Sequence, residues 1–155
     1  MVANLRRAVP GVAVTLDLMV GFPGESEEEY RESRDFVRML GPAGMHVFKY
    51  SHRPETPAAR LPGRVPAQVA KARSEEMLAL AEEGAASFRR RFVGESLSVL
   101  FEEETSLGGE RRWSGLSDNY IRVYATSREP LANQLKNVTM LGEVNDGLKG
   151  AVVAA

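Results

Sequence analysis

Two short segments combine residue types that suit ligand binding. The first, Gly21-Phe22-Pro23-Gly24-Glu25, directly follows an almost continuous apolar run, VAVTLDLMV, at residues 12–20. Glycines allow a backbone to approach a bound ring closely, and Phe22 offers a surface on which a ring can pack. The second segment contains an arginine, Arg53, which can hold a carboxylate or a phosphate through two parallel hydrogen bonds. Its other polar members are Tyr50, Ser51 and Thr56.

Asp17 is the polar exception within the apolar run at residues 12–20. A buried carboxylate is costly unless it is hydrogen-bonded or paired. We therefore interpret Asp17 either as a group near a ligand or as a structural residue satisfied by backbone donors, with Arg53 as a candidate partner. His46 alternates with apolar neighbours and is predicted to pack within a strand, whereas His52 is predicted to lie exposed in a loop.

The pattern around these segments predicts a strand, a helix and a second strand. The run at 12–20 is typical of a strand buried on both faces of a parallel sheet. Ser26 and Glu29 have capping-box spacing, so a helix should begin there, with Phe36, Val37 and Leu40 on its apolar side. Met45 to Tyr50 reads as the second strand. This βαβ unit is too small to cover its own faces and favours the last turns of a (β/α) barrel.

The remainder of the chain predicts a loop, a long helix and a small β-domain. A loop at 51–66 precedes a helix at about 67–92, with Gly94 as its C′ residue. Alternating apolar residues then indicate several short strands, as in a small antiparallel OB-like barrel. The expected fold class is thus α/β plus all-β, with domains at 1–93 and 94–155. The alternating residues are Leu97, Val99, Phe101, Ile121 and Val123.

Composition excludes several kinds of site. Cysteine is absent and only two histidines occur, which excludes disulfides and cysteine-ligated clusters and leaves no expected metal site. The net charge of −1 gives no global attraction to nucleic acid; residues 1–93 carry +2 and residues 94–155 carry −3. No run approaches the ~18 apolar residues of a membrane span, and no signal peptide is evident, so we expect a cytoplasmic protein without a membrane partner.

The two segments together resemble the radical-SAM methylthiotransferase family. Its pattern is roughly D-[IL]-[IM]-V-G-F-P-G-E-[TS]-E-E, followed after a strand by Y-S-x-R-x-G-T-P-A-A. The tail, with GLSDNYIRVY in its middle, is similar to the TRAM domain that ends these enzymes. Glu55 departs from the family's usual glycine, and Lys49 stands where proline is common. The matching residues are Asp17, Gly21, Phe22, Pro23, Gly24, Glu25, Glu27, Tyr50, Ser51, Arg53, Thr56, Pro57, Ala58 and Ala59.

The resemblance implies an enzyme that uses S-adenosylmethionine and two 4Fe-4S clusters to modify tRNA. The family's cluster cysteines, including a C-x-x-x-C-x-x-C motif, lie N-terminal to the matching region, and this chain has none. We therefore expect no catalytic residue and no bound cofactor in this chain alone, and a missing N-terminal half as its partner. The His46-Val47-Phe48 and Ser117-Asp118-Asn119-Tyr120 segments favour 2-methylthiolation of N6-threonylcarbamoyladenosine in tRNA.

Several alternatives remain open. Isopentenyladenosine enzymes are near relatives, and ribosomal-protein methylthiotransferases are more distant ones. A non-catalytic RNA-binding module and a truncated reading frame without a role of its own are further readings.

By the same resemblance, each candidate residue receives a role. The predicted cofactor-binding residues are Gly21, Phe22, Pro23, Gly24, Glu25, Tyr50 and Arg53. The predicted substrate-binding residues near them are Asp17, Ser51 and Thr56. On the barrel, a mixture of cations and aromatics suits stacking and phosphate contact. Those predicted RNA-binding residues are Arg111, Arg112, Tyr120, Arg122 and Lys136, with Trp113 and Asn119 beside them. A core position is the alternative interpretation of Trp113.

Two charge runs complete the prediction. Arg89-Arg90-Arg91 at the end of the long helix reads either as a solvated basic helix end or as a contact with tRNA phosphates. Glu102-Glu103-Glu104 is expected to lie away from the RNA-binding cations, because it would repel RNA.

Overall fold

The computed structural model describes residues 1–153 and separates into two compact units. The sheet unit comprises essentially Val14–Ala85, and the barrel unit comprises Ala3–Ala13 together with the chain from Ala86 onward. The mixed α/β character expected from the sequence is confirmed. The predicted domain boundary at Val93/Gly94 stays a prediction.

The sheet unit is built on two parallel strands, β1 (Thr15–Val20) and β2 (Gly44–Lys49), joined through the helix α2 (Glu27–Leu40). Their register pairs Thr15 with Gly44 and Val20 with Lys49. The predicted capping box begins α2: the Glu29 amide donates to Ser26 Oγ over 3.1 Å, and the Ser26 amide donates to the Glu29 carboxylate over 2.8 Å. Strand, helix and strand therefore form the predicted βαβ unit.

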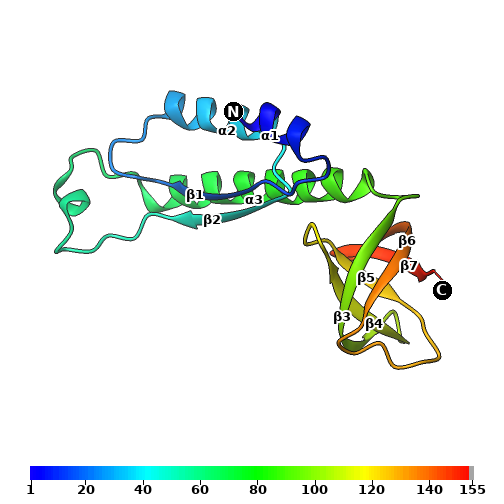
Figure 1. The fold of residues 1–155 in the computed structure, drawn as a ribbon. Coiled ribbons are helices and arrows are strands. Elements are labelled where there is room, and N and C mark those ends of the chain that lie inside the picture. Colours follow the sequence, from blue (N-terminus) through cyan, green and yellow to red (C-terminus); the bar gives the residue numbers. More distant parts are fainter. Residues whose placement is uncertain (154–155) are drawn as a thin grey trace. The chain divides into compact units, whose positions relative to one another are not determined.

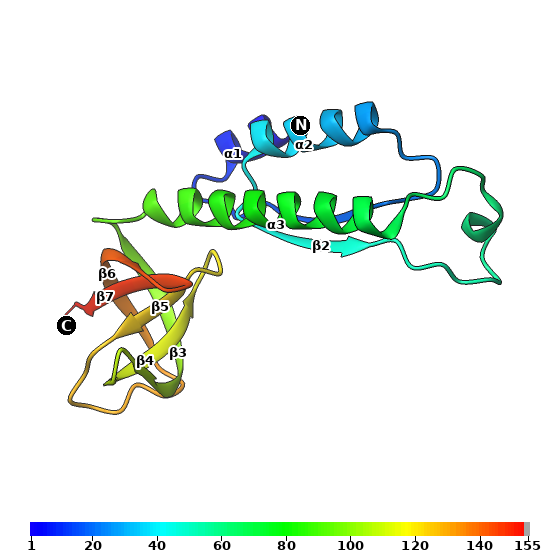
Figure 2. The same ribbon diagram turned by 180° about the vertical axis from the view of Figure 1, so that it is seen from behind.

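The core of the sheet unit lies on one face of this sheet. The helices α2 and α3 (Ala67–Arg90) run alongside the strands in both views (Figures 1 and 2). They contribute Tyr30, Met77 and Leu80, which pack with Val20. Partly buried residues from both strands complete this covered face; they are Leu18, Met45 and Val47.

The other face of the sheet is open, which corrects the prediction of a strand buried on both faces. The burial of β1 alternates, so that Thr15, Asp17 and Met19 are exposed. Asp17 therefore keeps its hydration and needs no buried partner. In the register Asp17 stands opposite His46 and Met19 opposite Phe48, which are also exposed.

The prediction that His46 packs within a strand is thus wrong. Side chains of a strand alternate between the two faces of the sheet, and His46 lies on the face that no helix covers. The apolar residues of α2 are also only partly buried. Val37 is buried, but the Phe36 side chain is 56% exposed, contrary to the prediction that it belongs to the packed side.

Two short helices and the end of the long helix α3 remain to be placed. The loop after β2 contains a 3-10 turn, η1 (Pro57–Arg60), and α1 (Val2–Ala8) begins the chain. The long helix α3 ends at Arg90 and continues as i→i−3 turns through Val93, so Gly94, although it has φ +91°, lies beyond the C′ position. Within residues 1–153, no helix combines the length and apolar character required to cross a membrane.

The barrel unit contains a closed five-stranded barrel in the order β3-β4-β5-β7-β6. Most pairs are antiparallel as predicted, but β5 and β7 run parallel. Alternation places Val99, Phe101 and Val123 in the core, each fully buried. The strands are β3 (Ser96–Leu107), β4 (Glu110–Ser117), β5 (Arg122–Ala125), β6 (Leu135–Val144) and β7 (Gly147–Val152).

Gly115 provides a test of barrel closure. A β-carbon at this position would overlap the Leu100 carbonyl oxygen and the Phe101 backbone, which cannot move without disturbing the β3–β4 pairing. Gly115→Ala should therefore destabilise the barrel by about 2 kcal/mol. Gly142→Ala is the matched control, because nothing lies within 4 Å of its β-carbon. Urea unfolding followed by the fluorescence of Trp113, the single tryptophan, measures both; equal midpoints would contradict the packing.

Candidate functional site

The two predicted binding loops meet at the same end of the sheet. Both follow the carboxyl ends of parallel strands, and the Tyr50 amide donates to the Val20 carbonyl over 2.9 Å. The Phe22 and Tyr50 rings form an edge-to-face contact with centroids 5.4 Å apart. Further out, the Gly24 amide donates to the Gly63 carbonyl over 2.8 Å. The residues of both loops can therefore face a common ligand.

A buried arginine on α3 holds the first loop in place. Arg73, only 6% exposed, donates from Nη1 to Glu25 Oε2 over 2.6 Å and to the Glu25 carbonyl over 3.1 Å. The same carboxylate accepts the Gly21 amide over 2.7 Å. The second guanidinium nitrogen lies 3.2 Å from Glu27 Oε2. Glu25 is thus occupied by protein groups and positions the loop.

The surroundings of Arg73 explain how a guanidinium is tolerated there. The guanidinium carbon Cζ of Arg73 lies 4.9 Å from the centroid of the Tyr30 ring, a cation–π arrangement. Burial by itself lowers the pKa of Arg73, but the hydrogen bonds with Glu25 and Glu27 raise it above the ordinary value overall. Burial and a hydrogen bond to Glu76 raise the pKa of Tyr30. The charged arginine and the neutral phenol are therefore the stable forms.

The other residues predicted in these loops differ in their exposure. Phe22 is 41% exposed, and Gly24 has φ +90° with no atom within 4 Å of the place where a β-carbon would stand. Arg53 and Ser51 are exposed, while Thr56 donates its hydroxyl to the Arg53 carbonyl over 2.9 Å. The remaining predicted residues are Pro23, half-buried in the same loop, and Asp17, on the open face of the sheet.

A cavity of about 450 Å³ lies beside these loops in the sheet unit. Of the predicted residues, only Gly21 and Tyr50 line it. Sequence reasoning missed its other residues, because only the packing of the second loop against α3 brings them together. Those residues are Lys49, His52, Arg64, Val65, Pro66, Ala67 and Ala70.

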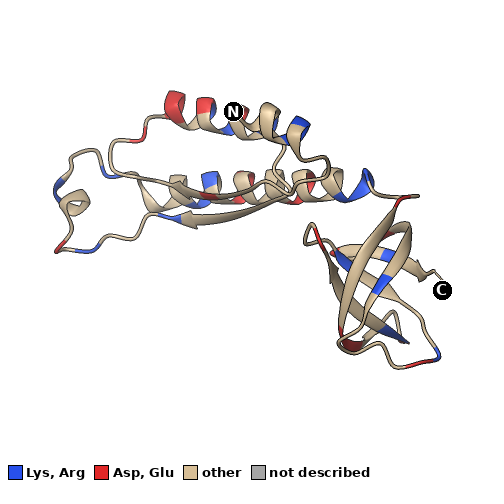
Figure 3. Cartoon of the chain, viewed as in Figure 1, with Lys and Arg blue, Asp and Glu red and all other residues tan. Residues whose placement is uncertain are grey.

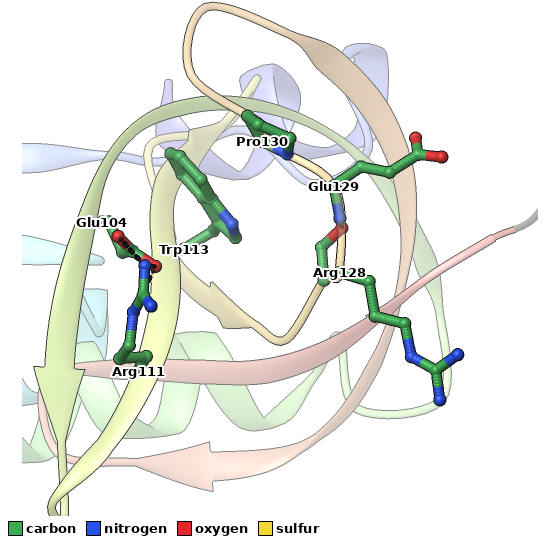
Figure 4. Close-up of a pocket in the computed structure, with 7 residues that line it drawn as sticks. Glu104, Arg111, Trp113, Arg128, Glu129 and Pro130 are labelled. Atoms are coloured by element: carbon green, nitrogen blue, oxygen red, sulfur yellow. Dashed lines mark hydrogen bonds and ion pairs between the residues drawn. The ribbon is translucent and has the colours of Figure 1, made fainter.

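On the barrel, the predicted RNA-binding arginines are paired with carboxylates. Arg111 donates to both oxygens of Glu104, over 2.8 and 2.7 Å, as Figure 4 shows. Arg122 donates to Glu102 over 2.6 Å, and Arg112 pairs with Glu110. The expectation that the acidic run lies away from these cations is therefore wrong: the antiparallel pairing of β3 and β4 brings Glu104 near Arg111, and Arg122 on β5 reaches Glu102 on β3.

The other predicted barrel residues are more available. Tyr120 is 81% exposed and has φ +63°, whereas Lys136 is half-buried without an ion pair among residues 1–153. Trp113 lines a cavity of about 250 Å³ next to Pro130, with Arg111 at its edge (Figure 4). The helix-end arginines contact the protein itself: Arg91 lies over the Phe88 and Phe92 rings, and Arg90 lies 3.5 Å from Glu143. Among the described residues no group of three or more His, Cys, Asp or Glu is arranged to hold a metal ion.

Comparison with known proteins reveals extensive similarity, although no family model matches the chain. It is 36% identical over 141 residues to the threonylcarbamoyladenosine tRNA methylthiotransferase MtaB of Bacillus subtilis, covering 89% of this chain and 31% of that protein. It is 42% identical over 100 residues to a tRNA-2-methylthio-N(6)-dimethylallyladenosine synthase of Mycobacterium tuberculosis, covering 64% of this chain and 18% of that protein. A synthase of the same name from a Nocardioides species is equally similar. The chain spans about a third or less of these relatives.

Replacement of Arg73 tests whether it anchors the loop. Arg73→Met leaves the Glu25 carboxylate largely buried without its cation, so the sheet unit should lose about 3 kcal/mol of unfolding free energy. Arg31→Met is the control: its ion pair with Glu27 is exposed and should contribute less than about 0.5 kcal/mol. Urea unfolding followed by far-ultraviolet circular dichroism of the helices measures both. Similar small losses in the two variants would contradict the anchoring role.

Proposed function

This chain belongs to the tRNA methylthiotransferase family, matching its C-terminal part, and from that premise we propose that it forms part of an enzyme that adds a methylthio group to N6-threonylcarbamoyladenosine in tRNA. The observation that supports this substrate is the length of the similarity: it extends over 141 residues for the threonylcarbamoyladenosine enzyme, against 100 to 103 residues for the dimethylallyladenosine enzymes. Dimethylallyladenosine and a ribosomal protein are the alternative substrates.

In this proposal the sheet unit is a section of a (β/α) radical-SAM barrel. Its open face carries Asp17, Met19 and Phe48, and such a mixture of polar and apolar groups suits the interior of a larger barrel. Two parallel strands covered on one face only are marginal alone. Protein upstream of the matched region would supply the other strands and the cysteines that hold the two 4Fe-4S clusters, and this chain would not be catalytic without it.

The loops at the carboxyl ends of β1 and β2 are the proposed contribution to S-adenosylmethionine binding, since barrel enzymes bind ligands at that end. The residues fit this role: Phe22 presents an exposed ring, the Gly24 backbone is accessible, and the buried Tyr50 hydroxyl has no partner within residues 1–153. Arg53 is free to hold a carboxylate. The cofactor would supply the radical chemistry, and these residues would bind and orient it beside Ser51 and Thr56.

In this proposal Glu25 contributes by orienting the loop. Its carboxylate accepts hydrogen bonds from Arg73 and from the Gly21 amide, and its own contact with the cofactor stays a prediction. Gly21 likewise fits against α3, where a β-carbon would lie 2.8 Å from that of Ala70.

The barrel is the proposed RNA-contacting part, as an OB-like TRAM domain. Five strands closed into a barrel are the architecture that OB-folds use to bind oligonucleotides. Tyr120 offers an exposed ring for stacking, and Arg111, Arg112, Arg122 and Lys136 offer cations. Because three of these arginines are paired with glutamates, a phosphate must compete with the carboxylates to bind them.

A chimera tests the enzymatic proposal. The part of the Bacillus subtilis relative upstream of the matched region is joined to this chain and supplied with tRNA, S-adenosylmethionine, sulfide and a reductant. We expect 2-methylthio-N6-threonylcarbamoyladenosine, detected by mass spectrometry of digested tRNA. The intact relative is the positive control. A folded chimera that contains both clusters but leaves the tRNA unmodified would contradict the proposal.

Loss of two barrel arginines tests the RNA contact. Arg111→Ala combined with Arg112→Ala should weaken tRNA binding more at low salt than at high salt, lowering the slope of log affinity against log salt by about 1.4 if each arginine neutralises one phosphate of a single strand. Glu104→Gln with Glu110→Gln is the control, because it breaks the same ion pairs but should strengthen binding. Equal weakening at both salt concentrations would exclude a phosphate role.

The same measurement separates a second candidate, a non-catalytic RNA-binding module. The closed barrel with its own core favours this candidate. A barrel unit that binds tRNA tightly, combined with an inactive chimera, would support the module over the enzyme.

A further inference from the structure

The cavity beside the two loops lies on the helix side of the sheet. Lys49 belongs to the same face of β2 as Met45 and Val47, which pack against the core residues of α2 and α3. The cavity continues from Lys49 to Ala67 and Ala70 at the start of α3. It is therefore separate from the open face that carries Asp17, Met19 and Phe48.

The rim of this cavity is cationic. Lys49 and Arg64 line it together with His52, and no ion pair or side-chain hydrogen bond joins these three side chains to any part of the chain that the structure describes. The described lining contains no carboxylate. Figure 3 shows the basic residues spaced along the segment from β2 to α3, where Glu55 is the single acidic residue. These positive charges are thus not neutralised within the sheet unit, in contrast to the paired arginines of the barrel.

Backbone amides add to this positive potential. The first helical backbone hydrogen bond of α3 is donated by the Ala70 amide to the Pro66 carbonyl, over 3.0 Å. The amides of residues 67–69 therefore have no intrahelical acceptor, as at every helix start, and Ala67 itself lines the cavity. Free amides and the positive end of a 24-residue helix favour an anion here.

The cavity also has an apolar part. Val65, Pro66, Ala67 and Ala70 are its apolar lining residues. Tyr50 also lines the cavity. A volume of about 450 Å³ lies within the range of small-molecule sites. A ligand with an anionic group and a flat or apolar body matches both parts of this cavity.

We propose that this cavity binds a phosphate of a nucleotide, with Lys49 and Arg64 holding the phosphate and the apolar part holding the sugar or base. S-adenosylmethionine fits less well, because its sulfonium and ammonium groups would be repelled by the unpaired cations. The source that we favour, a phosphodiester of the bound tRNA, rests on the proposed function. The phosphate site itself does not depend on that function.

Nuclear magnetic resonance of the full chain tests the site. Amide shifts are recorded with AMP, adenosine, inorganic phosphate and S-adenosylmethionine. We expect AMP to perturb the amides of His52, Arg64, Val65 and Ala67, which line the cavity but lie outside the proposed cofactor-binding set, to bind at least tenfold more tightly than adenosine, and to bind more weakly as salt increases. Inorganic phosphate should perturb the same rim amides more weakly. Equal binding of AMP and adenosine, or tighter binding of S-adenosylmethionine at these amides, would overturn the proposal.

Matched variants identify the residues. Lys49→Met with Arg64→Met should weaken AMP binding at least tenfold, because both phosphate partners are lost. Arg60→Met with Lys71→Met removes the same two residue types from exposed positions outside the cavity and should change binding less than twofold. Equal effects of the two pairs would overturn the proposal. The spectra themselves report whether each variant is folded, and the salt dependence in the unaltered chain needs no variant.

An anticodon stem–loop RNA separates the two sources of the phosphate. Displacement of AMP by this RNA supports the tRNA source, and absence of displacement supports a free nucleotide. These experiments measure binding only, whereas the chimera experiment measures the modified nucleoside. Failure to bind AMP would therefore not contradict the enzymatic proposal, and an inactive chimera would not contradict the phosphate site.

Discussion

The burial of one guanidinium constrains the whole end of the sheet unit. Arg73 lies almost fully inside the protein, and a charge removed from water is stable only when it is paired and hydrogen-bonded. Glu25 and Glu27 provide that pairing, and Glu25 also accepts the Gly21 amide. The turn after β1 is consequently fixed to α3, which places Phe22 against Tyr50 and Gly24 against Gly63. The groups of the first loop thus take their position from this contact, whereas Tyr50 is held by the Val20 carbonyl.

Because of this constraint, residues that are neighbours in the sequence have different roles. Glu25 is used to position the loop, whereas Phe22 and the Gly24 backbone stay accessible to a ligand. The neighbouring cavity lies where the second loop meets the start of α3, and its Lys49 and Arg64 side chains are unpaired among residues 1–153. The barrel shows the opposite arrangement, since Arg111, Arg112 and Arg122 are already held by glutamates. An anion in the cavity would therefore meet Lys49 and Arg64 without displacing a carboxylate.

Local sequence signals predicted the elements well, because their causes are local. The Ser26 and Glu29 capping box, the alternation around Val99 and the two loops at one end of parallel strands are all present. Predictions that depended on long-range contacts were less successful. Asp17 and His46 are exposed because only one face of the sheet is covered, which an apolar run cannot reveal.

Long-range pairs were likewise missed. Nothing near Arg73 in the sequence identifies Glu25, 48 positions away, as its partner. The pairing of Glu104 with Arg111 follows from the β3–β4 register, which composition does not contain. An arginine within the apolar stripe of a helix is the one signal that could have indicated a buried ion pair, and charged residues at such positions are rarely buried without a partner.

The central claim is that the Arg73–Glu25 contact holds the turn after β1 in one conformation. Amide hydrogen exchange at Gly21 in the unaltered chain tests it most directly, because this amide donates to the Glu25 carboxylate over 2.7 Å. The account predicts exchange as slow as that of the β1 amides bonded to β2. Exchange at the rate of an unstructured loop would contradict it.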